Sequence, residues 1–333
     1  MKGGGLPLLL YFKPLFTVFY RVCFLASLAD SVYMERLLRG PVTLDSLTGA
    51  PGQEPCHRQA LEAWLGLGVR LGVLKKEAGG YRLRGFVARK LACPENDALR
   101  ALVREVAGLH HLYILHTPEK LAQCRLWDPK EQHRAYGDII ARSSRSLEPF
   151  LFEVIDRIFP NAGTVRLLEV GCGHAGYMMY AAARNKDLKG IGLELDAHVA
   201  EMARGAIQSR GLEDRIEILT QDVRAYGAQE PFDIITLYNN IYYFPVEERR
   251  SLLELLSGLL KPGGRLVLTT GCTNGGIEFE LVNVIHAATR GWGRLPHKDE
   301  LLRQLDAAGF ERISALRLVP GDEYYAFIGY LRG

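Results

Sequence analysis

The chain has 333 residues, of which 48% are hydrophobic and 24% are charged, and its formal net charge is +3. This composition is that of an ordinary soluble globular protein, and its length exceeds the roughly 100–200 residues of one domain, so two domains are expected. The six cysteines lie far apart without a C-x-x-C pair. This spacing argues against a zinc or disulfide framework and favours reduced thiols in a cytoplasm.

The N-terminal stretch LPLLLYFKPLFTVFYRVCFLASLAD is strongly apolar, but Lys13 and Arg21 interrupt it. A membrane-spanning helix needs about 20 apolar residues, and a signal sequence is not normally split by charges. We therefore expect a helix that is buried or faces another subunit, without stable membrane insertion. Contact with a membrane surface is the alternative.

Residues 1–95 follow the outline of a winged helix. Apolar residues recur at helical spacing over 15–39 and stop at Gly40-Pro41, and VTLDSL predicts a short helix. A longer helix is expected over 57–74, and two short strands around Gly79-Gly80. The pattern predicts a mainly helical, winged-helix-like domain.

Such a domain binds DNA or serves as a packing module. A recognition helix concentrates Lys and Arg, whereas the third helix here offers only Arg58 and Arg70 beside Trp64 and many leucines. Residues 1–150 carry a net charge of +7, which suits an anionic partner or an ordinary solvated surface equally. We expect a dimerisation domain over 1–95 that binds no nucleic acid.

Residues 96–160 are expected to form bridging helices, and residues 161–333 alternate strands with helices. Short apolar strands separated by helices predict a mostly parallel, doubly wound Rossmann-like α/β sheet covered on both faces. A final pair of strands around Pro320-Gly321 is expected to be antiparallel. Strands are predicted near 165–170, 189–194, 215–220, 232–238, 264–270, 311–319 and 323–331, and helices near 175–185, 197–210, 246–260 and 298–308.

The stretch LLEVGCGHAG, residues 167–176, places Gly171, Gly173 and Gly176 in a G-x-G-x-x-G pattern at a strand end. This pattern is expected around a dinucleotide. Glu169, however, stands two residues before the first glycine. A carboxylate at this position can pair with a cationic cofactor, whereas a dinucleotide site does not require one there. Only about 60 residues follow the fifth strand, too few for the catalytic domain of a dehydrogenase.

Five segments, LLEVGCGHAG, GIGLELDAHVAEMAR, ILTQDVRAY, FDIITLYNN and LLKPGGRLVLTT, occur in the order and spacing of class I S-adenosylmethionine-dependent methyltransferases, which the chain resembles over 164–333. The upstream domain further resembles that of dimeric small-molecule O-methyltransferases. In those proteins the N-terminal domain exchanges contacts with a partner and caps the active site. The resemblance implies S-adenosyl-L-methionine as cofactor, a homodimer and a small-molecule methyl acceptor.

The resemblance also assigns cofactor-binding positions. Gly171 and Gly173 would let the backbone approach the methionine part of the cofactor, and Glu169 would pair with its ammonium group. Glu194, followed by Leu195, would accept the ribose hydroxyls. The remaining positions would contact the adenine (Asp222 and Val223) and flank the sulfonium (Tyr238 and Asn239).

The acceptor side departs from the family. The related O-methyltransferases carry a histidine shortly after the fourth strand, whereas LYNNIYYFPVEE holds Tyr243 at that position. A tyrosine with its ordinary pKa of about 10 is a poor base at neutral pH. Tyr243, Tyr242 and His286 are the candidate catalytic residues. Other histidines could serve as the base instead (His110, His111, His116 and His297), and no metal site is expected.

These observations predict a cytoplasmic methyltransferase acting on a small molecule, with O-methylation favoured. An acidic acceptor that ionises unaided, or a sulfur, nitrogen or carbon nucleophile that needs no base, remains an alternative. Two other classes are open: a DNA-binding regulator that senses a ligand through a methyltransferase-like domain, and a silent partner of an active homologue.

Overall fold

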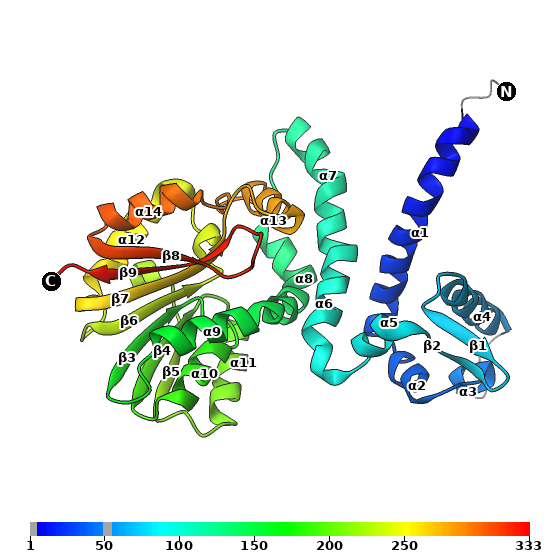
Figure 1. The fold of residues 1–333 in the computed structure, drawn as a ribbon, viewed down its shortest axis with the longest axis horizontal. Helices are drawn as coiled ribbons and strands as arrows, with labels where there is room; N and C mark the ends of the chain where they lie inside the picture. The colour runs from blue at the N-terminus through cyan, green and yellow to red at the C-terminus, as the bar shows by residue number, and fades with distance from the viewer. Residues whose placement is uncertain (1–4, 49–54) are drawn as a thin grey trace. The chain divides into compact units, whose positions relative to one another are not determined.

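The chain forms two compact units. The computed structural model describes residues 5–48 and 55–333. Unit 1 takes the described residues up to Leu112 and returns for Arg134–Ser146, while unit 2 consists of Tyr113–His133 and Leu147–Gly333. Helices occupy most of the segment between residues 96 and 160, as expected, and they are shared between the two units (Figure 1).

Unit 1 is mainly helical and carries one hairpin. The two strands of the hairpin are antiparallel, with Leu74 opposite Leu83, which agrees with the turn predicted around Gly79-Gly80. An isolated bridge joins Val42 to Tyr81 of the second strand. The elements up to α8 are α1 (Gly5–Ala29), α2 (Met34–Arg39), α3 (Leu44–Thr48), α4 (Pro55–Arg70), β1 (Leu74–Glu77), β2 (Gly80–Leu83), α5 (Gly85–Leu91), α6 (Asp97–Glu105), α7 (His111–Ala122) and α8 (Pro129–Ser143).

The single helix expected over 15–39 is wrong, because α1 ends at Ala29 and α2 begins at Met34. At the break the Ser31 backbone N–H and hydroxyl both donate to the Leu28 carbonyl, at 3.0 and 2.8 Å. Such local side-chain bonds compete with helical ones. The Asp30 carboxylate forms ion pairs with Arg104 and Arg142, which hold the chain in the turn.

Helix α1 packs into unit 1 at its C-terminal end, where Phe24 and Leu28 are buried. Burial within the chain, the first of the two expected alternatives, is therefore wrong for Leu10–Tyr20, and the alternative that the helix faces another subunit stays a prediction. By length and composition, Leu10–Ala29 could also cross a membrane. The large apolar side chains exposed on α1 are Leu8, Leu10, Tyr11, Phe12, Leu15, Phe16, Val18, Phe19 and Tyr20.

Unit 2 contains one seven-stranded sheet in the order β5-β4-β3-β6-β7-β9-β8. All neighbouring pairs from β5 to β7 are parallel, and β9 is antiparallel to both β7 and β8. This confirms the predicted doubly wound sheet with an antiparallel strand at the end of the chain. The strands are β3 (Val165–Val170), β4 (Leu188–Glu194), β5 (Ile216–Thr220), β6 (Phe232–Tyr238), β7 (Leu260–Gly271), β8 (Phe310–Arg317) and β9 (Tyr324–Leu331).

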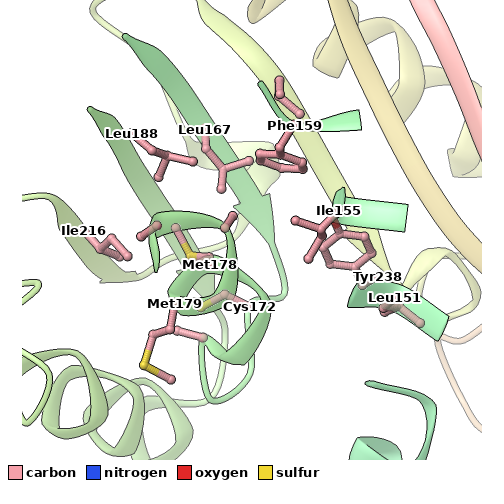
Figure 2. Close-up of a cluster of buried hydrophobic side chains, with 14 of the residues drawn as sticks. Leu151, Ile155, Phe159, Leu167, Cys172, Met178, Met179, Leu188, Ile216 and Tyr238 are labelled. Atoms are coloured by element: carbon pink, nitrogen blue, oxygen red, sulfur yellow. The ribbon is translucent and has the colours of Figure 1, made fainter. Parts of the chain in front are cut away.

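Helices cover both faces of this sheet and enclose two apolar cores. On one face, Leu151 and Ile155 of α9 lie beside Tyr238 of β6, and Met178 of α10 packs near Leu167 of β3 (Figure 2). Helix α11 covers the same face, and α12 and α14 cover the other (Figure 1). The helices are α9 (Glu148–Ile158), α10 (Gly176–Arg184), α11 (Ala197–Gln208), α12 (Arg249–Gly258), α13 (Ile277–Ala287) and α14 (Lys298–Ala307).

Glycine in β4 sets how closely α10 and the loop before it approach the sheet. A Cβ atom on Gly192 would lie 2.8 Å from the Cys172 sulfur, 2.9 Å from the Met178 sulfur and 2.7 Å from Ile218 Cδ1. These distances are shorter than a van der Waals contact. A hydrogen atom in place of a side chain is therefore required at this position of the strand.

We expect Gly192→Ala to lower the free energy of unfolding by about 1–3 kcal/mol, because overpacking displaces Cys172 and Met178. Gly205→Ala is the matched control: Gly205 lies within α11 and a Cβ there meets nothing within 4 Å. This control should stabilise the protein by about 0.5–1 kcal/mol. Urea titrations of both variants measure the difference, and equal effects of the two substitutions would contradict this account.

Candidate functional site

The glycine loop between β3 and α10 is tied to the end of β4. The backbone N–H groups of Gly171 and Cys172 both donate to the Leu193 carbonyl, at 2.8 and 3.0 Å. Gly171 has φ +68° and Gly173 has φ +54°, values that only glycine adopts at no steric cost. A Cβ on Gly171 would also collide with the Asn240 side chain. The loop therefore requires glycine for its conformation and for the close approach of Asn240.

The structure brings Glu194 to this loop, and its predicted contact with the ribose stays a prediction. One carboxylate oxygen accepts the Gly173 N–H at 3.0 Å, and the other accepts the Asp196 N–H at 3.0 Å. Leu195, the next residue, is 70% exposed. Glu194 thus lies at the carboxyl end of β4 beside the glycine loop, the place where an adenosine ribose binds in folds of this kind.

Glu169 and Tyr238 form a buried pair at the switch point of the sheet. Glu169 on β3 lies opposite Thr236 on β6, and Tyr238 follows two residues later on the same face. Glu169 is 1% exposed and Tyr238 is 6% exposed, yet Glu169 Oε2 and the Tyr238 hydroxyl have no hydrogen-bond partner among the described residues. Burial raises the pKa of both groups, and the nearby Glu169 raises the pKa of Tyr238 further.

The other predicted cofactor positions have structural contacts of their own. Asp222 accepts the Arg224 N–H at 2.9 Å and pairs with the Arg224 guanidinium at 2.6 Å, which lowers the pKa of Asp222. Val223 is 3% exposed and belongs to the core. Asn239, at φ +52°, accepts the Tyr324 hydroxyl at 3.0 Å. These contacts hold the strand ends in place, and the predicted adenine and sulfonium contacts remain predictions.

The three candidate catalytic residues lie together. The ring of His286, on α13, has its centroid 4.3 Å from that of Tyr242 and 5.1 Å from that of Tyr243. Trp292 completes this aromatic cluster, 5.0 Å from His286 and 4.7 Å from Tyr243. The sequence analysis missed Trp292, whose only signal was its place in the segment after the fifth parallel strand.

The imidazole of His286 is held in one orientation. Its Nδ1 lies 2.8 Å from the Val282 carbonyl, one turn back along α13. Its Nε2 is buried and has no hydrogen-bond partner among the described residues. Burial, together with the positive charge of Arg249, lowers the pKa of His286 to about 4. The side chain is therefore neutral at pH 7, with an unused acceptor atom.

Three of the other candidate histidines have different surroundings. His110 and His111 belong to unit 1, where His110 lies 3.2 Å from Glu105. His297 contacts the Thr273 hydroxyl instead. Within residues 5–48 and 55–333, no three His, Cys, Asp or Glu side chains are arranged to hold a metal ion.

Known proteins with this fold are methyltransferases. Residues 167–264 match the family of methyltransferase domains. The mitomycin 7-O-methyltransferase MmcR superposes with a TM-score of 0.79 at 16% identity, over 99% of this chain and 100% of that one. Human N-acetylserotonin methyltransferase, solved with S-adenosylmethionine, superposes with a TM-score of 0.74 at 16% identity over the whole of both chains. The architecture is therefore that of the class I methyltransferases.

A curated relative agrees. The methyltransferase GfsG of Streptomyces halstedii is 27% identical over 177 residues, which cover 52% of this chain and 61% of that protein. The matched region thus spans little more than half of the relative's length. Residues 167–264 therefore match a methyltransferase domain within a class I methyltransferase fold, and the neighbour solved with S-adenosylmethionine indicates that compound as the cofactor.

The described residues fit this cofactor. A buried carboxylate oxygen without a partner, such as Glu169 Oε2, costs free energy unless a donor or a cation reaches it, and the ammonium group of the methionine part supplies both. A pyrophosphate would instead bring a second negative charge to Glu169. The donors and acceptors at the ends of β3, β4 and β6 therefore suit a cationic cofactor better than a dinucleotide.

The buried carboxyl of Glu169 makes ligand-free stability depend on pH. The pKa of Glu169 is raised in the folded protein, so the fold is most stable when this carboxyl is protonated. The free energy of unfolding is therefore highest below the ordinary carboxyl pKa of about 4.3 and falls as the pH rises above it, toward the raised pKa of the folded state. Glu169→Gln should therefore melt at a higher temperature than the wild type at pH 8, with little difference at pH 4. Thermal melts without cofactor measure this, and a Gln variant less stable at pH 8 would contradict it.

Proposed function

We propose that the chain transfers a methyl group from S-adenosylmethionine to a small-molecule acceptor, with an oxygen as the favoured nucleophile. The observation that carries this proposal is the pair of unpartnered oxygens on Glu169 and Tyr238, buried beside the glycine loop. Such a pair suits the ammonium and sulfonium of the cofactor. The O-methyltransferase named among the structural neighbours supports an oxygen acceptor.

The cofactor would bind across the carboxyl ends of the strands. Glu169 would take the ammonium group, and the N–H groups around Gly171 and Gly173 would line the methionine part. Glu194 would exchange its present bonds to the Gly173 and Asp196 N–H groups for the ribose hydroxyls. Leu195, Asp222 and Val223 would border the adenosine, and Tyr238 and Asn239 would flank the sulfonium.

The acceptor would lie at the aromatic cluster. Methyl transfer is an in-line displacement, so catalysis rests on aligning the nucleophile with the methyl group and on an electrostatic setting that suits the transition state. Tyr242 and Tyr243 follow β6 by four and five residues, close to the glycine loop that Asn240 touches. Together with His286 they would form the catalytic side of the pocket.

Titration calorimetry with S-adenosylmethionine, S-adenosylhomocysteine and NAD tests the cofactor assignment. The first two should bind and NAD should not. Glu194→Ala should weaken S-adenosylhomocysteine binding by about tenfold or more, because hydrogen bonds to a charged group are lost. Glu213→Ala, an exposed acidic residue on the same unit, is the control. NAD binding without S-adenosylhomocysteine binding would refute the assignment.

We further propose that the chain is a cytoplasmic homodimer in which a winged-helix-like domain over residues 1–95 serves dimerisation. A helix that is apolar on all sides is normally buried, and α1 exposes large apolar side chains from Leu10 to Tyr20 in a single chain. A second copy would cover them. The helices over 96–160 would connect this domain to the methyltransferase domain over 161–333.

Phe16→Lys is expected to weaken the dimer. Phe16 is 44% exposed on α1 and stacks on Phe12, so a lysine there would place a charge in the proposed interface. Light scattering behind gel filtration should show a dimer for the wild type and a monomer–dimer mixture for the variant. Val32→Lys, at an exposed position outside α1, is the control. A monomeric wild type, or one that binds lipid vesicles, would refute this assembly.

A further inference from the structure

We infer that His286 selects the acceptor: its Nε2 takes a hydrogen bond from a neutral hydroxyl group on a planar molecule that lies against Tyr242, Tyr243 and Trp292. Ammonium and carboxylate groups are disfavoured at the same position. This inference rests on the proposed methyltransferase function and narrows its substrate class.

The first step concerns which nitrogen carries the proton. A backbone carbonyl only accepts hydrogen bonds, so Nδ1 must be the donor to Val282, at 2.8 Å. In the neutral imidazole the other nitrogen, Nε2, then has a lone pair and no hydrogen. It is fully enclosed and has no partner in residues 5–48 and 55–333. A buried acceptor without a donor is costly, and a bound hydroxyl would supply the donor.

The second step concerns place. The Asn240 amide donates to the Val170 carbonyl at 2.6 Å and lies against Gly171. Tyr242 is only two residues further along the chain, in the short turn Ile241–Tyr243. The aromatic cluster therefore begins directly beside the glycine loop, on the side where a methyl acceptor must lie. Its three aromatic rings present flat apolar faces, which favour a planar molecule.

The third step concerns charge. Arg249, at the start of α12, is 0% exposed, and it forms no ion pair within the described residues. Its guanidinium donates to the Phe244 and Arg294 carbonyls, and its Nη1 has no partner among the described residues. This buried positive charge acts on His286. It opposes an ammonium group in the cluster and stabilises negative charge that develops on an oxygen.

A carboxylate group on the acceptor is disfavoured at Nε2 of His286 for a different reason. It has no proton to donate, so its lone pairs would face the lone pair of Nε2. A hydroxyl group matches both features: its hydrogen bonds to Nε2, and its oxygen gains negative charge as it attacks. The oxygen forms a bond to the methyl carbon while its hydrogen is held by Nε2, the carbon–sulfur bond breaks, and the hydroxyl proton leaves to water. The products are a methyl ether, neutral S-adenosylhomocysteine and a hydrated proton, and the imidazole stays neutral.

Three probes that differ in one group test this selection: 2-naphthol, 2-naphthylmethylamine and 2-naphthoic acid, titrated at pH 7 into the protein loaded with S-adenosylhomocysteine. We expect 2-naphthol to bind at least about tenfold more tightly than the other two. His286→Phe keeps an aromatic ring and removes Nε2, so it should abolish the preference. His57→Gln, at an exposed histidine of unit 1, should leave it unchanged.

Equal or tighter binding of the ammonium or carboxylate probe would overturn the inference, as would the failure of all three to bind or an unchanged preference in His286→Phe. Spectra of the protein with ¹⁵N-labelled histidine provide a readout that needs no ligand. They should show His286 neutral with its proton on Nδ1 at pH 7, and a proton on Nε2 would overturn the inference. Absent binding of S-adenosylhomocysteine would instead reject the proposed function.

Discussion

The convergence of three strand ends on one backbone loop is the constraint on which the site depends. The Leu193 carbonyl, at the end of β4, accepts two N–H groups of the glycine loop, and the Asn240 amide ties the end of β6 to the end of β3. Backbone atoms link β4 to the loop, and the Asn240 side chain links β6 to β3. The carboxyl groups of Glu169 and Glu194 thereby reach the same loop from neighbouring strands.

This arrangement lowers the stability of the ligand-free protein. A buried acid at the centre of the sheet with one oxygen unpartnered lowers stability, and natural proteins commonly accept such costs at functional sites. The aromatic cluster repeats the pattern with an acceptor nitrogen on His286 and a guanidinium on Arg249, both buried and incompletely hydrogen-bonded. The buried polar atoms of Glu169, Tyr238, His286 and Arg249 that have no partner among the described residues thus lie in unit 2, between the two apolar cores or at their edge.

The sequence was sufficient to predict the strands of unit 2, because buried parallel strands are short apolar runs with glycine or acidic residues at their ends. It also placed Glu194 beside the glycine loop and grouped Tyr242, Tyr243 and His286 as candidates. It did not predict the break after Ala29, since the Arg142 that pairs with Asp30 lies 112 residues away. Trp292 and Arg249 were missed for the same reason: their importance comes from long-range packing, which no local pattern records.

The path of the chain between the two units restricts how this protein can be divided into fragments or exchanged by recombination. The polypeptide crosses between the units three times, after Leu112, His133 and Ser146. The excursion over Tyr113–His133 is bonded to the far end of α13, through Tyr113 to Thr289 and Trp127 to Ala288. A gene fragment beginning at residue 147 would encode the whole sheet but omit the support of the helix that carries His286. Recombination of a single continuous gene segment could therefore not exchange unit 2 without also exchanging Arg134–Ser146 of unit 1.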